Sequence, residues 1–180
     1  MASRQSILGL MSESPSLDGL RVLAHPVRLR ILSLLTGVAM SAAEAARELG
    51  ETQANISYHL RRLHEAGLLD VAEEVRIRGG LAKRYRHDPE SGGRFASTNP
   101  QEEQLLIAAM AEELKRRGEF LGQQGSATDA EIWVDRENWE KALEHARELS
   151  ELLHAAARPP RTRGTIPVSA TVSLFEMTRS

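Results

Sequence analysis

The sequence predicts an α+β fold: a helical N-terminal domain with a β-hairpin, then one long helix and a strand-helix-strand C-terminal extension. Apolar residues recur at every third or fourth position between residues 17 and 63, as in amphipathic helices. β-Forming residues flank a turn at residues 79–80, and residues 166–174 alternate apolar with polar, as in strands. With 180 residues, 41% of them hydrophobic, the chain is long enough to bury a core.

Composition excludes several classes of protein. The 23 basic and 25 acidic residues give a net charge of -2, so the chain is not generally polycationic. It has no cysteine, which excludes disulfides and thiolate metal sites. We find no run near the roughly 20 apolar residues of a membrane span and no signal-peptide pattern at the start. A cytoplasmic protein without membrane attachment is expected.

The first helices are predicted from a break in the periodic pattern. Residues 1–15 have no periodicity and are expected to form a flexible arm before a domain that spans residues 16–90. His25 and Pro26 interrupt the helical pattern that starts at Leu17. The residue before a proline avoids helical angles, whereas proline favours the first helical turn. Two short helices are therefore expected, one on each side of this pair.

The next two helices carry their own start and stop signals. Ser41 stands three residues before Glu44, which is a capping box, and Gly50 can end that helix. Thr52 can cap a following helix, which Gly67 can end. Two helices separated by so tight a break have the spacing of a helix-turn-helix.

A hairpin is predicted directly after this pair. Val71, Val75 and Ile77 favour a strand, residues 78–81 supply a turn, and the chain returns through Tyr85 among basic residues. Three helices followed by a hairpin with a basic tip describe a winged helix. Residues 16–90 are therefore predicted to form a winged helix-turn-helix domain.

The second half of the chain is predicted to hold a long helix and a mixed unit. After a loop at residues 91–98, a helix at 99–122 carries more apolar residues than a surface helix needs, which predicts that it is a dimerisation helix. The region 129–177 is expected to be α+β, with strands at 130–134 and 166–177 around a helix capped by Asp135. We expect it to serve dimerisation or to receive an effector.

The helix at residues 53–66 has an unusual polar face. At about 100° per residue, Ile56, Leu60 and Leu63 share one narrow arc. The opposite arc and its flanks offer amide, hydroxyl, phenol, imidazole and guanidinium groups, of the kinds that contact base edges in the major groove. A solvated amphipathic helix is the alternative. The candidate DNA-binding residues on this helix are Gln53, Asn55, Ser57, Tyr58, His59, Arg61 and Arg62.

Three motifs in one order resemble a known family. LAHPVRLRIL (residues 23–32), TQANISYHLRRLHEAGLL (52–69) and RIRGG (76–80) are similar to the winged helix-turn-helix repressors of the ArsR family. The resemblance covers roughly residues 17–88. It implies that the helix with Gln53, Ser57 and His59 enters the major groove. It also implies that the wing, with Arg78 at its tip, touches the DNA backbone or minor groove.

Charge is distributed unevenly along the chain. Residues 53–86 contain seven basic and four acidic residues, a local charge of +3, to which Lys83 and Arg84 of the hairpin contribute. Residues 129–153 contain three basic and eight acidic residues, a local charge of -5. A phosphate-facing end and an acidic far end agree with a DNA-binding module that has an attached regulatory part. We therefore add Lys83 and Arg84 to the DNA-binding candidates.

Metal binding and catalysis find little support in the sequence. The best-known ArsR members sense metals through cysteines, which this chain lacks. His145 with Glu144 or Glu148, or His154, offers nitrogen and oxygen ligands, but a histidine on a polar helix face is usually solvated. We expect no metal and no other cofactor. No catalytic motif is found, and the chain is not expected to be an enzyme.

The sequence as a whole predicts a dimeric, cytoplasmic transcriptional regulator that acts as a repressor. Its expected partners are double-stranded DNA, a second copy of the chain and a small-molecule effector. Trp133, Trp139 and Phe175 are candidates to line an apolar effector pocket, although such residues more often form a core. Two alternatives stay open: a winged helix used for protein contacts, and a small-molecule-binding protein with a vestigial DNA-binding domain.

Overall fold

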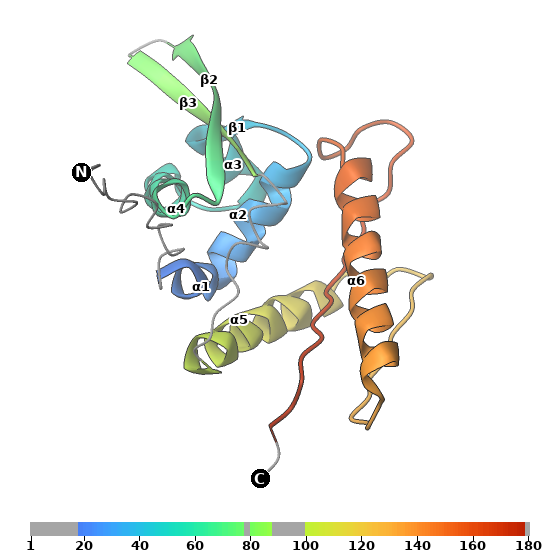
Figure 1. Ribbon diagram of the computed structural model, residues 1–180. Coiled ribbons are helices and arrows are strands. Elements are labelled where there is room, and N and C mark those ends of the chain that lie inside the picture. The colour runs from blue at the N-terminus through green and yellow to red at the C-terminus, as the bar shows by residue number, and fades with distance from the viewer. Residues whose placement is uncertain (1–17, 78–79, 88–99, 179–180) are drawn as a thin grey trace, which may run out of the picture.

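The computed structural model describes residues 18–77, 80–87 and 100–178 (Figure 1). The predicted arm at 1–15, the loop at 91–98 and Arg78 lie outside these residues. Six helices and three strands follow one another along the described chain. They are α1 (Asp18–Leu23), α2 (Pro26–Thr36), β1 (Met40–Ser41), α3 (Ala42–Leu49), α4 (Gln53–Glu65), β2 (Leu69–Ile77), β3 (Gly80–His87), α5 (Pro100–Gly118) and α6 (Arg136–Ala156).

The helix boundaries follow the predicted caps. His25 is extended (φ -150°, ψ 122°), and its Nδ1 accepts a hydrogen bond from the Val27 N–H, while Pro26 opens α2. At the start of α3, Ser41 and Glu44 form the capping box, with the Ser41 N–H donating to Glu44 Oε2 at 2.8 Å. The prediction of separate helices around residues 25 and 26 is confirmed.

The turn between α3 and α4 is held from two sides. Gly50 adopts the left-handed conformation (φ 67°), and the Glu51 N–H donates to the Ala46 carbonyl at 3.0 Å. Arg30 of α2 donates to the Leu49 carbonyl at 2.5 Å and lies 3.3 Å from the Glu51 carboxylate. These contacts fix the direction in which α4 leaves the turn.

The hydrophobic core lies between α2, α3, α4 and the sheet. Its largest fully buried side chains are Ile31, Leu35, Ile56, Leu60, Leu63, Leu68 and Leu69. The apolar arc of α4 therefore faces the core, as its spacing predicted. Burial of each large aliphatic side chain contributes about 1.5–3 kcal/mol relative to its exposure. This burial presses α4 against α2 and leaves the polar arc of α4 in solvent.

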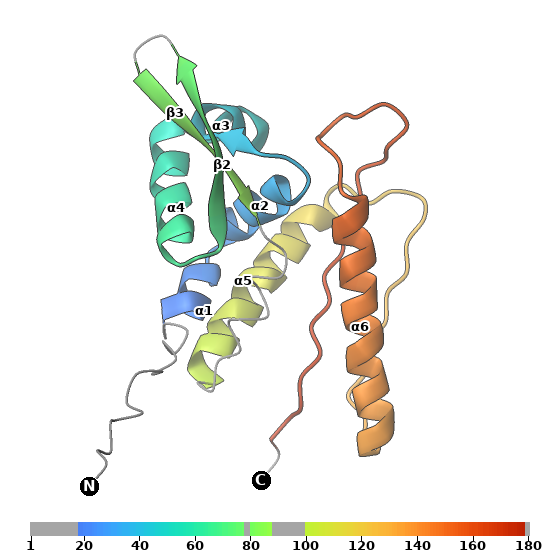
Figure 2. The same ribbon diagram turned by 45° about the horizontal axis from the view of Figure 1, so that its top comes forward.

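The three strands form one antiparallel sheet in the order β1-β3-β2. The β2–β3 hairpin pairs Leu69 with His87 at its base, and the register shifts between Val71 and Glu73, so Ala72 forms a bulge. Figures 1 and 2 show this hairpin projecting beyond the end of the helical layer. Helices α2, α3 and α4 with the hairpin form the predicted winged helix-turn-helix.

Helix α5 packs on the domain through one face. It lies against α1 and α2, on the side away from the hairpin (Figure 1), and buries Glu102, Ala109 and Glu113. Glu113 is paired with Arg116 at 2.8 Å, which compensates the burial of its charge. Ile107 and Leu114 point away from this face and are exposed. Part of the apolar excess predicted for this helix is therefore left exposed in the described part of the structure.

The C-terminal region differs from the prediction. Asp135 caps α6 as expected, by accepting a hydrogen bond from the Asn138 N–H at 2.8 Å. Residues 130–134 and 166–177, however, form no strand. Alternation predicts an extended backbone, but a strand also needs a neighbouring strand to pair with, and neither segment has one among the residues described. Residues 166–177 instead run between α5 and α6 (Figures 1 and 2).

None of the described helices combines the length and the apolar character that a membrane crossing requires.

Candidate nucleic-acid interface

The exposed face of α4 carries most of the predicted DNA-binding groups. The side chains of Gln53, Tyr58, Arg61 and Arg62 are exposed, and those of Asn55 and Ser57 are half-buried. The N-cap residue, Thr52, accepts a hydrogen bond from the Asn55 N–H at 3.2 Å, which starts the helix at the exposed turn. A rigid helix thus presents amide, hydroxyl, phenol and guanidinium groups to solvent on one side.

The structure places His59 differently from the prediction. Its side chain is only 5% exposed, because it packs on the His25 ring with centroids 4.7 Å apart. Its Nδ1 accepts a hydrogen bond from Arg28 Nε at 3.3 Å, and Arg28 also donates to the Val22 carbonyl at 2.9 Å. His59 lies on the side of α4 that faces α1 and α2. His59 therefore joins α4 to these helices instead of facing a groove.

Asn55 is oriented by two residues that the sequence did not single out. Its Nδ2 donates to Glu51 Oε2 at 3.1 Å, and Glu51 is paired with Arg30 of α2. The Asn55 amide is therefore held by Glu51, which is itself held by Arg30 of α2. Arg30 and Glu51 are 21 residues apart in the sequence. Their role in orienting Asn55 becomes visible only in the structure, where the turn between α3 and α4 lies against α2.

The two adjacent arginines of α4 have different surroundings. Arg62 lies 3.2 Å from Glu65, and both side chains are largely exposed. Such a surface pair contributes only about 0–1 kcal/mol, so a phosphate can replace the carboxylate at little cost. Arg61 has no hydrogen bond or ion pair to any residue within the described ranges. Both guanidinium groups are thus accessible to an anionic ligand.

The basic residues of the hairpin also divide into two kinds. Lys83 is half-exposed and lies 4.0 Å from Glu74, so its ammonium group can reach outward. Arg84 is tied down: Nη1 donates to Glu73 at 2.7 Å and Nη2 donates to the Ala39 carbonyl at 2.7 Å. Its Nε lies 3.3 Å from Glu44, an ion pair without hydrogen-bond geometry. Arg84 therefore holds the hairpin against α3, and its predicted contact with DNA stays a prediction.

The contact between the imidazoles of His25 and His59 is expected to make the stability of the fold depend on pH. Burial lowers the pKa of His59, and the neighbouring His25 and Arg28 lower it further; burial and Arg28 lower the pKa of His25. In the unfolded chain, both histidines have the ordinary imidazole pKa of about 6.5. Just below that pH they bind more protons in the unfolded chain than in the folded one. The contribution of these two histidines to the free energy of unfolding is thus fully present above about pH 6.5. It is lost as the pH falls toward their lower pKa values in the folded chain. Urea unfolding midpoints measured from pH 8 to pH 5 should decrease accordingly.

Two histidine variants test this prediction: His59→Gln is the test and His145→Gln is its control. His59→Gln removes a buried imidazole and should flatten the decrease below pH 6.5, whatever its effect on stability at pH 8. His145→Gln removes an exposed imidazole from α6 and leaves the His25 and His59 contact intact. An equal decrease in wild type and His59→Gln would contradict the assignment.

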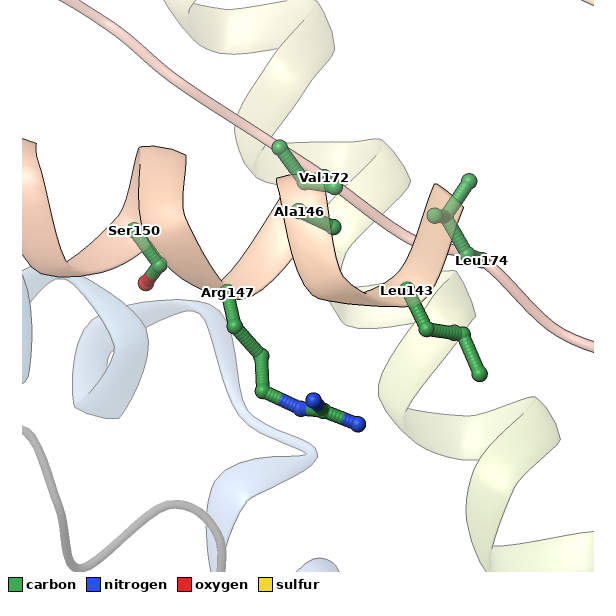
Figure 3. Close-up of a pocket in the computed structure, with 6 residues that line it drawn as sticks. All are labelled: Leu143, Ala146, Arg147, Ser150, Val172 and Leu174. Atoms are coloured by element: carbon green, nitrogen blue, oxygen red, sulfur yellow. The ribbon is translucent and has the colours of Figure 1, made fainter. Parts of the chain in front are cut away.

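The three aromatic residues predicted to line an effector pocket do not form a closed site. Trp133 is 89% exposed, Phe175 is exposed and Trp139 is half-buried. A shallow hollow of about 280 Å³ lies between α6 and the C-terminal segment (Figure 3), lined by Leu143, Ala146, Arg147, Ser150, Val172 and Leu174. None of the three predicted aromatics lines it. His145 contacts Glu148 at 3.1 Å, and the described part of the chain holds no cluster of three metal-ligating side chains.

Comparison with known proteins bears on the first half of the chain. Residues 23–72 match the family model of a helix-turn-helix domain. A solved structure described as a possible transcriptional regulator for arsenical resistance is 28% identical, over 60% of this chain and 100% of that chain, with a TM-score of 0.34. No curated protein matches the chain significantly.

The winged helix-turn-helix geometry and the family model define the class of protein as a DNA-binding regulator. Within that class, the family model identifies residues 23–72 as a helix-turn-helix domain, and the ArsR-like type that the three sequence motifs indicate stays a prediction. Proteins of this class typically act by binding DNA and not by catalysis.

Proposed function

We propose that the protein is a dimeric, cytoplasmic repressor that reads the DNA major groove with α4. The observation that carries the proposal is the exposed face of α4, where the amide of Asn55 is fixed by Glu51 beside two accessible arginines. An oriented amide can form a bidentate contact with adenine, and a guanidinium can do so with guanine. Held side chains lose less conformational entropy on binding than free ones do.

The groups around Asn55 divide into readers and anchors in this proposal. Gln53, Asn55, Ser57 and Tyr58 occupy the N-terminal half of α4 and would contact bases. Arg61 would contact phosphate, and Arg62 would contact either phosphate or a base. Lys83 and Arg78 of the wing would touch the DNA backbone or minor groove. His59 and Arg84 would act by positioning α4 and the hairpin.

The proposed dimer uses the uncovered face of α5. Ile107 and Leu114 are seven residues apart, which places them on one side of the helix two turns from each other. Ala111 stands between them, so a second α5 could approach closely. A symmetric pair would present two α4 helices to successive half-sites. The division into a 16–90 DNA-binding domain, a 99–122 dimerisation helix and a 129–177 dimerisation or effector region is part of this proposal.

An effector would act by preferring one arrangement of the two subunits. The hollow beside α6 supports such a role, since Leu143 and Leu174 offer apolar contacts in its lining (Figure 3). Arg147 also lines the hollow, and its guanidinium is paired with Glu144. This composition suits a small apolar molecule.

Operator selection tests the proposed function. The wild-type protein should enrich a two-fold symmetric sequence from random or genomic DNA. Anisotropy titrations with that sequence should give an affinity that falls linearly with salt on a logarithmic scale, with a slope of about -0.9 for each phosphate contact. If no sequence is enriched and the affinity does not change with salt, the proposal is wrong.

A further inference from the structure

An apolar surface, which we call the C-terminal surface, extends over the last third of the chain. Its members are Ile132, Trp133, Val134, Ile166, Val168, Val172, Leu174, Phe175 and Met177, all of them exposed. Arg136 pairs with Glu176 at 2.6 Å, which places the end of the chain beside the start of α6 and next to residues 132–134. Helix α6 itself has no buried residue. This region therefore lacks a core of its own in the part of the molecule that the structure describes.

The size of the C-terminal surface fits an interface between proteins. An aromatic side chain can bury about 150–250 Å² and an aliphatic one somewhat less, so these nine residues, exposed to this degree, leave on the order of 1,000 Å² uncovered in total. One side of a stable protein interface buries roughly 800 Å². Monomeric proteins rarely expose an apolar patch above a few hundred Å². The nine side chains together therefore expose enough apolar area for one side of a dimer interface.

The backbone of residues 166–177 is extended and largely unpaired. Arg117 of α5 anchors it, by donating to Ser169 Oγ at 3.1 Å, Thr171 Oγ1 at 3.1 Å and the Ala170 carbonyl at 3.4 Å. No backbone-to-backbone hydrogen bond joins this segment to any other described residue. Apart from the Ala170 carbonyl, which accepts from Arg117, and Pro167, which has no N–H, the backbone groups of this segment are left without a backbone partner among the described residues. Such an extended, alternating segment is an edge to which another strand can add.

We propose that a second copy of this chain covers the C-terminal surface, with residues 166–174 of the two copies paired as antiparallel strands. Antiparallel pairing about a two-fold axis is self-complementary, so it needs no other sequence. With the axis at Ala170, Ile166 faces Leu174 and Val168 faces Val172, so that apolar residues meet apolar residues. This interface lies beyond the α5 contact of the proposed repressor and supplies the strand partner that one chain lacks.

The first test measures mass in solution with the full chain. Light scattering after gel filtration should show a dimer for the wild type at micromolar concentration. Ile166→Lys combined with Val168→Lys should raise the dimer dissociation constant at least tenfold, because two charges would be buried at the interface. These side chains are 79% and 69% exposed, so the subunit fold should be unchanged by circular dichroism. Ser173→Lys, on the polar side of the same segment, is the matched control.

Disulfide trapping tests the pairing itself, since the natural chain has no cysteine. Ala170→Cys should form a covalent dimer on mild oxidation, because the two copies of residue 170 meet at the axis. Ile166→Cys should not, because its two copies would lie about 26 Å apart along the strands, beyond the roughly 7 Å that a disulfide spans between Cα atoms. Equal trapping at both positions, or none at either, would contradict the antiparallel pairing.

The outcomes separate this interface from the proposed function. Ile107→Lys combined with Leu114→Lys tests the α5 contact in the same light-scattering assay. A monomeric wild type, or a dimer that only the α5 variant weakens, would overturn the C-terminal interface and leave operator binding to its own test. A dimer that the C-terminal variant weakens supports the interface, even if the selection enriches no DNA sequence.

Discussion

Leu60→Ala is expected to lower the free energy of unfolding by about 2–5 kcal/mol, because it leaves a cavity in a packed core. Leu60 is 1% exposed and lies in the seam that joins α4 to α2 and the sheet. A domain of this size has a total stability of only about 5–15 kcal/mol, so a large fraction would be lost. Urea denaturation followed by circular dichroism measures the effect.

The neighbouring residue is the control for this result. Arg61→Ala removes an exposed side chain without a described partner, and it should change the free energy of unfolding by less than about 0.5 kcal/mol. It should nevertheless weaken DNA binding and reduce the salt slope by about 1 if it removes a phosphate contact. A loss of stability as large in Arg61→Ala as in Leu60→Ala would contradict the orientation of α4.

Asn55→Ala is expected to reduce the discrimination between the operator and a singly altered site by about 1–3 kcal/mol, which is the contribution of one bidentate contact. The change should appear as a roughly 5- to 150-fold smaller affinity ratio between the two sites. Competition titrations with operators altered at one base pair at a time would locate the affected position. The unfolding midpoint should remain close to that of the wild type.

Two further variants separate contact from positioning. Glu51→Gln keeps the size of the side chain but weakens its ion pair with Arg30, so it should loosen the Asn55 amide and reduce discrimination less than Asn55→Ala does. Glu140→Ala removes an exposed carboxylate of α6, outside the winged domain, and should leave discrimination unchanged. If Asn55→Ala weakened all sequences equally, Asn55 would not be a base contact.

The sequence predicted the winged domain well because its signals are local. The capping box at Ser41 and Glu44, the glycine turn at Gly50 and the apolar spacing of α4 each depend on residues within about four positions. The roles of His59, Arg84 and Glu51 depend on neighbours that are 21 to 45 residues away in the chain. An arc calculated for one helix does not show which flank another helix covers, so the burial of His59 could not be predicted in this way.

The C-terminal strands were predicted wrongly for a different physical reason. Alternation at residues 166–174 reports that one side of the segment meets apolar surroundings. It does not report whether those surroundings belong to the same chain. The segment is extended as expected, whereas the pairing needs a neighbouring strand, and the described residues supply none.

Helix α2 has neighbours on two sides. It touches α4 through the core and through the Arg30 contact to the turn, and it touches α5 along the face that buries Ala109. Helix α4, proposed to bind DNA, and helix α5, proposed to contact the second subunit, therefore both pack against α2. A small tilt of α5 would turn α2 and change the angle between the two DNA-facing helices of a dimer. A change at the α5 contact between subunits would then alter the affinity for an operator, although no ligand binds near the DNA.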